Sequence, residues 1–582
     1  MKTRTWIRIT TIATVLGLTL AVVTPIAQAA TATSPTISWS RLVDEYLETF
    51  FRAHPHFAAS VGRHEYDGLL PDWSAAGIHA EVRRLKAFRQ RVTAFPESKL
   101  DAAQRFERDY LLTRIDREIY WRDVAEAPFR NPAFYLGFGD GGDSLDPSTY
   151  VVRPYGPPEQ RLRAFVRYAH SVAAVAPQIR KNLRLPLPAT YIKLGATGFG
   201  GLAEFYRHDV PQAFADVKDP ALQAELTAAI EPAAAALDAL AAWLRSESPH
   251  ATDGQPLGAE RYAAMLRMTE RVDLPIADIE VAGRADLARN LAALREACAQ
   301  YAPGATLHDC VGRVEAQKPA NGPVAEAREQ LVMLRRFVID HDLMTVPGTE
   351  EAQVQEAPPF NRQNGAYCDT PGPYEKQLPS VYYIAPPDPT WSAAEQAAYI
   401  KGRKILLFTS AHEVWPGHFL QFQWANRAPS KLASLFVGYA YAEGWAHYAE
   451  EMLWEKGLGA GDPETHIGQL IGALIRDVRL LSSIGLHTKG MTVAESEQMF
   501  REQAFVDPGT ARQQAARGTY DPGYLSYTLG KLMIRKLRTD YCSSRGGEAC
   551  WKDFHDHFLA FGGPPIPLLR RAMLPGDHGP VL

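Results

Sequence analysis

The sequence predicts a mainly α-helical protein with a minor β element. Apolar residues recur at steps of three and four over long stretches, and capping signals mark several helix starts. Only the segment 341–391 is rich in Pro, Gly and short β-prone pieces. The chain has 582 residues, 46% hydrophobic and 22% charged, which is typical of globular proteins and long enough for several domains or one large helical domain.

The first 29 residues have the three parts of a secretory signal peptide. Lys2, Arg4 and Arg8 precede an apolar run over 9–23, and Ala-Gln-Ala follows at 27–29. The alternative is a membrane anchor, but about 15 apolar residues fall short of the ~20 that a spanning helix needs. We therefore expect cleavage near residue 29, export to the periplasm or the medium, and no stable membrane insertion of the mature chain.

The charge of the mature chain disfavours two classes of partner. Removing the three cations of the signal segment changes the formal charge from −4 to −7. A mildly acidic surface has no electrostatic attraction for nucleic acid or anionic lipid. We expect neither as a partner.

Five cysteines in an exported chain suggest disulfides. Cys298 lies near Cys310, and Cys542 lies near Cys550, so two local disulfides are expected. Cys368 is left as an unpaired thiol. The sequence has no CxxC motif, so a thiolate metal site has little support.

Helix signals can be followed along the chain. Ser392 with Glu395 and Thr492 with Glu495 have the spacing of a capping box, and an Asp-Pro pair at 462–463 suits a helix start. The segment 380–384 suggests a small edge strand within a loop region. Two long amphipathic helices are predicted from the apolar positions Leu222, Leu226, Ile230, Ala233, Leu237, Leu240 and Leu244, and Ile276, Ile279, Gly283, Leu287, Leu291 and Leu294.

A division near residue 340 separates an N-terminal half from a C-terminal half that holds most of the sequence motifs. The N-terminal helical lobe is 30–340, and the C-terminal helical lobe, 341–582, carries the dense motifs. No Gly/Ser linker separates the halves. We expect two lobes flanking a cleft within one integrated domain.

The segment 412–418 reads His-Glu-Val-Trp-Pro-Gly-His and begins like the helical zinc-protease motif. Its second histidine comes six residues after the first, where an undisturbed helix would place the two side chains about 120° apart. Pro416 and Gly417 can break or kink the helix and bring His418 round to His412. Two zinc histidines therefore require a helix break here.

Glu443 supplies a third candidate ligand. It lies on a predicted second helix, and zinc hydrolases often use two histidines and a carboxylate with water in the fourth position. His447, one turn later, is the rival ligand. The alternative for the whole group is a buried polar cluster that stabilises helix packing.

Four segments resemble the signature blocks of the bacterial domain-of-unknown-function 885 family. They are 412–418, 443–450 (Glu-Gly-Trp-Ala-His-Tyr-Ala-Glu), 479–487 (Arg-Leu-Leu-Ser-Ser-Ile-Gly-Leu-His) and 524–531 (Tyr-Leu-Ser-Tyr-Thr-Leu-Gly-Lys). That family is similar to the helical gluzincin zinc metallopeptidases. The resemblance implies a large two-lobed helical metallopeptidase-like fold with a deep central cleft.

The resemblance also implies roles for single residues. His412, His418 and Glu443 would bind zinc, and Glu413 would be the general base. His447 is less expected as a ligand, because the family commonly has an apolar residue at its position.

The same resemblance suggests a second group of residues as contacts for an oxyanion or a substrate carboxylate, namely His487, Tyr520, Tyr524 and Tyr527. Tyrosines at helical spacing more often pack in the core, and Tyr520 and Tyr527 are the preferred candidates. Arg476 and Arg479 could pair with a peptide terminus. Salt bridges within the protein are the favoured interpretation of both arginines.

Two functions of different classes follow. The first is an exported zinc-dependent metallopeptidase that hydrolyses short peptides, with Glu413 as the base. The second is a non-catalytic helical protein that is stabilised by zinc or binds peptides. Within the enzyme class, an amidase or esterase acting on a non-peptide substrate is a further alternative. Glu413 favours an enzyme, because a purely structural metal site does not need it.

Overall fold

The computed structural model describes residues 38–137, 143–254, 256–358, 362, 365–375, 377–387, 389 and 391–582. The predicted signal segment 1–29 lies outside these residues. Helices predominate in the described part, and its strands form a single three-stranded sheet. The predicted class, mainly α with a minor β element, is confirmed.

The helices before the sheet belong to the N-terminal half. They are α1 (Trp39–Ala53), α2 (Pro55–Ser60), α3 (Ala75–Thr93), α4 (Ala102–Ile119), α5 (Ala127–Arg130), α6 (Ser148–Val151), α7 (Pro158–Asn182), α8 (Ala189–Ala213), α9 (Pro220–Ser246), α10 (Ala259–Glu270), α11 (Ile276–Tyr301), α12 (Leu307–Glu315) and α13 (Pro323–Asp340).

The helices after the sheet carry the motifs. They are α14 (Ala393–Tyr399), α15 (Arg403–Glu413), α16 (His418–Ala425), α17 (Lys431–Leu435), α18 (Tyr439–Glu455), α19 (Pro463–Thr488), α20 (Val493–Gln503), α21 (Pro508–Tyr520), α22 (Ser526–Cys542), α23 (Trp551–Ala560) and α24 (Ile566–Met573).

The helix starts predicted from capping signals are confirmed. Ser392 and Thr492 cap α14 and α20, and each forms a complete capping box with the glutamate three residues later. Asp462 caps α19 by accepting bonds from two backbone N–H groups of the first turn. The two predicted amphipathic helices are α9 and α11.

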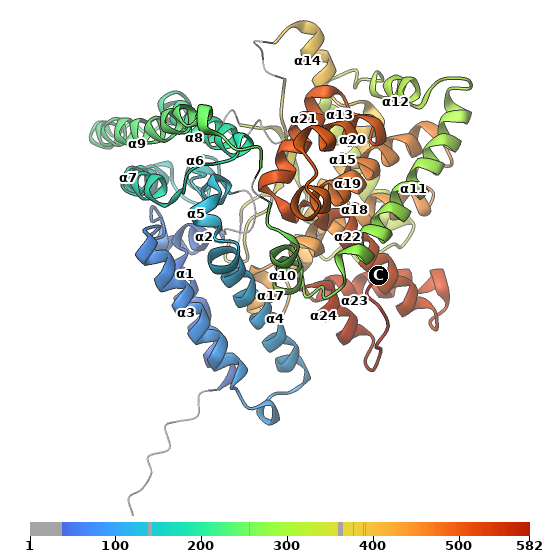
Figure 1. Cartoon of the computed structure of the whole chain (residues 1–582), viewed down its shortest axis with the longest axis horizontal. Coiled ribbons are helices and arrows are strands. Elements are labelled where there is room, and N and C mark those ends of the chain that lie inside the picture. Colours follow the sequence, from blue (N-terminus) through green and yellow to red (C-terminus); the bar gives the residue numbers. More distant parts are fainter. Residues whose placement is uncertain are drawn as a thin grey trace, which may run out of the picture.

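α9 is a core helix of the N-terminal half. Among the described helices it alone is long and apolar enough to cross a membrane, judged by length and composition. Its regularly spaced leucines are buried, and α7 and α8 pack against it (Figure 1). Burial against two neighbouring helices explains its apolar sequence.

The β element differs from the sequence expectation. The strands are β1 (Gln353–Glu356), β2 (Ala366–Asp369) and β3 (Val381–Ile384), in the order β1-β3-β2. β3 runs parallel to β1 and antiparallel to β2. The predicted edge strand is therefore the central strand. All four of its residues are buried, which suits a continuous run of β-branched and aromatic side chains.

The two halves of the chain share one apolar core. Figure 1 shows α11, from the N-terminal half, among the C-terminal helices, where it packs along α19. One cluster of buried apolar residues includes members from both sides of residue 340. The division into two lobes around a deep cleft stays a prediction.

The cysteines pair as expected. Cys298 bonds to Cys310 and Cys542 bonds to Cys550, while Cys368 is a free thiol in β2. Each disulfide closes a short local loop, so neither links distant parts of the fold.

Candidate metal centre

The predicted helix break occurs between the two histidines. α15 ends at Glu413, and α16 begins at His418. The chain turns back so closely that a Cβ on Gly417 would lie 1.7 Å from the carbonyl oxygen of His412, so only glycine fits. Trp445 of α18 donates a 2.8 Å hydrogen bond to the carbonyl of Pro416 and holds the turn in place.

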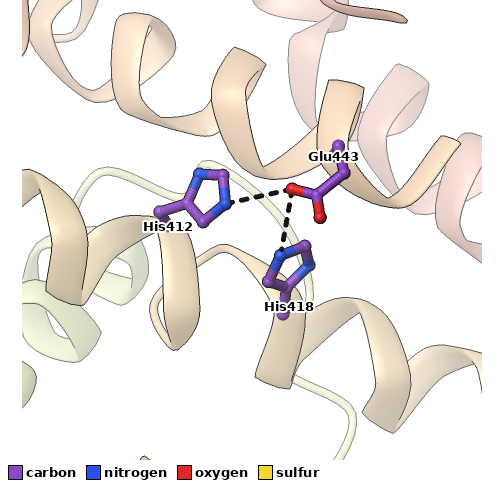
Figure 2. A group of neighbouring side chains, drawn as sticks. All are labelled: His412, His418 and Glu443. Carbon is purple, nitrogen blue, oxygen red and sulfur yellow. Dashed lines mark ion pairs between the residues drawn. The ribbon is translucent and has the colours of Figure 1, made fainter. Parts of the chain in front are cut away.

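The break brings three donor atoms together (Figure 2). Nε2 of His412 lies 3.3 Å from Oε2 of Glu443, and Nε2 of His418 lies 3.5 Å from the same oxygen. The donor atoms of the three residues all lie within 4.8 Å of one another. Two donors that each lie about 2.0–2.1 Å from a tetrahedral ion are about 3.3–3.4 Å apart. The two distances to Oε2 of Glu443 therefore match the spacing of zinc ligands.

The hydrogen bonding of these donors also fits a metal. Oε2 of Glu443 is buried and makes no hydrogen bond of acceptable geometry, although both histidine nitrogens lie close to it. Such an atom costs free energy unless a cation binds it. The three side chains are 6% (His412), 14% (His418) and 18% (Glu443) exposed, so the centre is enclosed but not sealed from solvent.

The charges at the centre favour a cation. Burial alone would raise the pKa of Glu443, but the two histidines outweigh it and hold that pKa well below its usual range. Burial and Arg476 lower the pKa of His412, but the carboxylates of Glu443 and Glu450 raise it to about 9. Positive charge is thus stabilised at this point of the fold.

Glu413 is the last residue of α15 and directly follows the first donor. Its side chain is buried, and burial raises the pKa of its carboxyl, with Glu443 adding to the rise. A carboxyl whose pKa is raised towards neutrality can exchange a proton with a substrate or a water molecule. This is the environment expected of a general base.

Glu450, a residue not predicted to take part, forms an outer layer with Arg476. Nδ1 of His412 donates a 2.6 Å hydrogen bond to Glu450, and Arg476 donates to the other carboxylate oxygen over 3.1 Å. The carboxylate orients the imidazole so that Nε2 points at Glu443. A sequence signal existed, because Glu450 follows Glu443 by two helical turns and lies on the same face of α18.

Replacing Glu450 by glutamine should weaken zinc binding by roughly 10- to 100-fold, the usual effect of losing a carboxylate that orients a histidine ligand. The measurement is the zinc dissociation constant from competition with a chelator. Glu296→Gln, an exposed change on α11, is the control and should bind zinc like the wild type. Equal affinity in the Glu450 variant would remove its orienting role.

Tyr527 lies beside the donors. Its ring stacks on that of His412, with centroids 6.3 Å apart, and the ring of Tyr439 lies 6.0 Å away. Burial raises the pKa of Tyr527, and the carboxylate of Glu443 adds to the rise, so its hydroxyl keeps its proton. Close packing of α18 on α22 fixes this placement, because a Cβ on Gly444 would lie 2.5 Å from the Cα of Gly530.

His447 does not join the donor triangle. It is fully buried on α18, and its Nδ1 lies 3.9 Å from the carboxylate of Glu450. Burial and the nearby Lys531 lower the pKa of His447 to about 3, which keeps the ring neutral.

His487 is held by the backbone. Its Nε2 donates to the carbonyl of Gly518 over 2.8 Å, and its Nδ1 accepts from the N–H of Leu257 over 3.3 Å. Burial lowers the pKa of this ring to about 4. Both nitrogens are engaged, which leaves neither of them for an oxyanion.

Tyr520 and Tyr524 occupy different environments. Tyr520 is the last residue of α21, and burial raises its pKa to about 12. Tyr524 is fully buried and donates a 2.8 Å hydrogen bond to Ser482, as a core tyrosine does. Of the candidate tyrosines, Tyr527 is the one that stacks on a donor histidine.

Comparisons with known proteins identify the fold and the family. Among curated proteins none matches the chain. The chain is similar to the structure of "a putative lipoprotein of unknown function" from Shewanella oneidensis, with a TM-score of 0.75, 22% identity, and coverage of 92% of this chain and 100% of the other. It is also similar to the structure of a "putative lipoprotein" from Colwellia psychrerythraea, with a TM-score of 0.75, 18% identity, and coverage of 92% and 99%.

The family described as "Bacterial protein of unknown function (DUF885)" matches residues 55–573, a range that holds the donor triangle, Glu413 and Tyr527. The match to the family therefore covers nearly the whole described chain and not only the four sequence segments. The protein belongs to this family of bacterial proteins of unknown function.

Proposed function

We propose that the protein is an exported zinc-dependent hydrolase that cleaves peptide bonds of short peptides. The observation that carries the proposal is the convergence of His412, His418 and Glu443 on one point. The buried carboxyl of Glu413 directly follows the first of these donors in the chain. Three such donors leave the fourth position of a tetrahedral zinc ion for water, as in catalytic zinc sites.

A bound zinc ion would supply Lewis acidity towards the scissile carbonyl and a lower pKa for its water. The side chains of the protein supply the remaining chemistry. Glu413 accepts the proton of the attacking water and returns it to the nitrogen of the leaving amine. The protonated hydroxyl of Tyr527 can donate to the carbonyl oxygen as negative charge develops there.

The non-catalytic alternative is less well supported. Structural zinc sites are usually closed by four protein ligands, whereas the donor group found in the described part of the chain has three. A structural site also has no use for a buried carboxyl at Glu413. An ester or a non-peptide amide is accommodated by the same chemistry, so these substrates belong in the test.

Export is proposed from the N-terminal segment. Residues 1–29 have the composition of a signal peptide, and the two similar structures are named as lipoproteins, a class of exported protein. A periplasmic or secreted mature protein accords with the two disulfides, which persist in oxidising compartments.

The proposal is tested by metal analysis of the purified mature chain together with a defined library of short peptides, esters and amides. We expect about one zinc per chain and cleavage of peptides, detected by mass spectrometry, that stops after treatment with a chelator and returns with zinc. A chain that binds zinc fully but cleaves no member of the library would contradict the proposal. Cleavage that persists without metal would contradict it equally.

A further inference from the structure

Three arginines surround the ring of Tyr527. The guanidinium carbons of Arg479, Arg476 and Arg517 lie 4.7, 5.7 and 5.9 Å from its centroid. Arg476 and Arg479 come from α19, and Arg517 comes from α21. Three positive charges around one ring repel one another unless anions compensate them.

Two of the three charges are compensated within the protein. Arg476 forms an ion pair with Glu450 at 3.0 Å. Arg517 forms an ion pair with Asp521 at 3.0 Å and donates to the hydroxyl of Tyr439. Arg476 therefore forms the salt bridge expected from the sequence.

Arg479 is different. Its Nε donates a 2.8 Å hydrogen bond to the amide oxygen of Gln514, which is a neutral partner. Within the described ranges no carboxylate lies within ion-pair distance of Arg479. Burial lowers the pKa of its guanidinium, and the positive charge of Arg517 lowers it further. A largely enclosed arginine beside like charges is a strong site for an anion.

A cavity of about 300 Å³ lies against this arginine. Its charged lining holds the cations Arg476, Arg479 and Lys401 and the carboxylates Glu315 and Asp507. Apolar lining includes Ile405 and Ile475. Thr409, one turn before Glu413 on α15, also lines it, so the cavity extends along α15 close to the proposed base. This size, at the small end of ligand pockets, suits one or two residues of a peptide.

We propose that Arg479 binds the free carboxyl-terminal carboxylate of a peptide substrate, so that the protein removes residues from the carboxyl terminus. This inference rests on the proposed function. Tyr527 contacts both Arg479 and the zinc-site residue His412, which places the anion site beside the donors. Consecutive residues of an extended peptide are about 3.3–3.6 Å apart along the chain, so a carboxylate at Arg479 lies only a few residues beyond the bond that is cut.

The test compares peptides that differ only in the terminal charge. The first probes are N-acetylated tripeptides that vary in the last residue, each prepared as the free acid and as the carboxyl-terminal amide. The second probes are tripeptide amides with Asp as the second residue, which carry a side-chain carboxylate but no terminal one. Binding to the zinc-loaded full chain carrying Glu413→Gln is measured by calorimetry. We expect the acids to bind about 10- to 100-fold more tightly than their amides, the range of a charge-assisted contact.

Variants of Arg479 identify the source of this preference. Arg479→Gln should abolish the preference for the acid, and Arg479→Lys should restore part of it. The control Arg512→Gln removes one charge from an exposed position on α21 and should keep the full preference. A merely structural role for Arg479 would change stability without changing the ratio of acid to amide binding.

The outcomes separate the two proposals. Equal binding of acids and amides, binding of neither, or an unchanged preference in Arg479→Gln would overturn the terminal-carboxylate inference. Tight binding of the Asp amides would assign the site to an acidic side chain instead, which also overturns it. Hydrolysis of amides as fast as acids by the wild type would overturn the removal of carboxyl-terminal residues and leave the proposed hydrolase intact. Acid-selective binding without any hydrolysis would contradict the hydrolase, and with it the removal of residues, but would keep Arg479 as the site of the terminal carboxylate.

Discussion

Replacing Glu413 by glutamine should lower kcat by roughly 10²- to 10⁴-fold while leaving the zinc content and substrate binding unchanged. Glutamine keeps the shape of the side chain but cannot accept the proton of the attacking water. The base acts in the transition state, so its loss lowers kcat rather than raising KM. The measurements are zinc content, melting temperature and peptide hydrolysis on the variant and the wild type side by side.

The same variant separates an enzyme from a zinc-stabilised scaffold. If Glu413 were a structural hydrogen-bond partner, its replacement would lower the melting temperature or the metal content, and activity would fall with them. Glu296→Gln makes the same chemical change on an exposed face of α11 and should match the wild type in all three measurements. Wild-type turnover in a fully metallated Glu413→Gln protein would remove the catalytic role.

Replacing His412 or His418 by alanine should abolish zinc occupancy near neutral pH and all hydrolysis with it. Each histidine supplies one of three ligands, and two remaining ligands hold zinc too weakly to survive purification. The zinc-to-protein ratio, measured by elemental analysis, checks the result. Full occupancy in the double variant would reject the ligand assignment.

Two further histidines provide controls for this experiment. His447→Ala should keep its zinc, because the ring lies apart from the donor triangle, although a buried cavity will lower its melting temperature. His208→Ala alters an exposed residue of α8 and should change neither property. Loss of zinc from the His447 variant alone would restore the rival ligand.

Local patterns in the sequence were sufficient for the helices and the disulfides. A capping box needs only residues three apart, so Ser392 and Thr492 could be identified without the fold. Cys298 and Cys310 are only 12 residues apart, on the consecutive helices α11 and α12. The strand at 381–384 was placed correctly but given the wrong position in its sheet, because the neighbours of a strand are set by distant segments.

The sequence by itself determined that two zinc histidines require a helix break after His412, and it offered Glu443, with His447 as the rival, as the third ligand. Pro416 and Gly417 act within one turn, so their effect is readable from local geometry. Only the tertiary structure decided what surrounds that centre. Glu450 and Arg479 act through contacts between α15, α18, α19 and α21, and such contacts depend on how the helices pack rather than on the order of residues within any one of them.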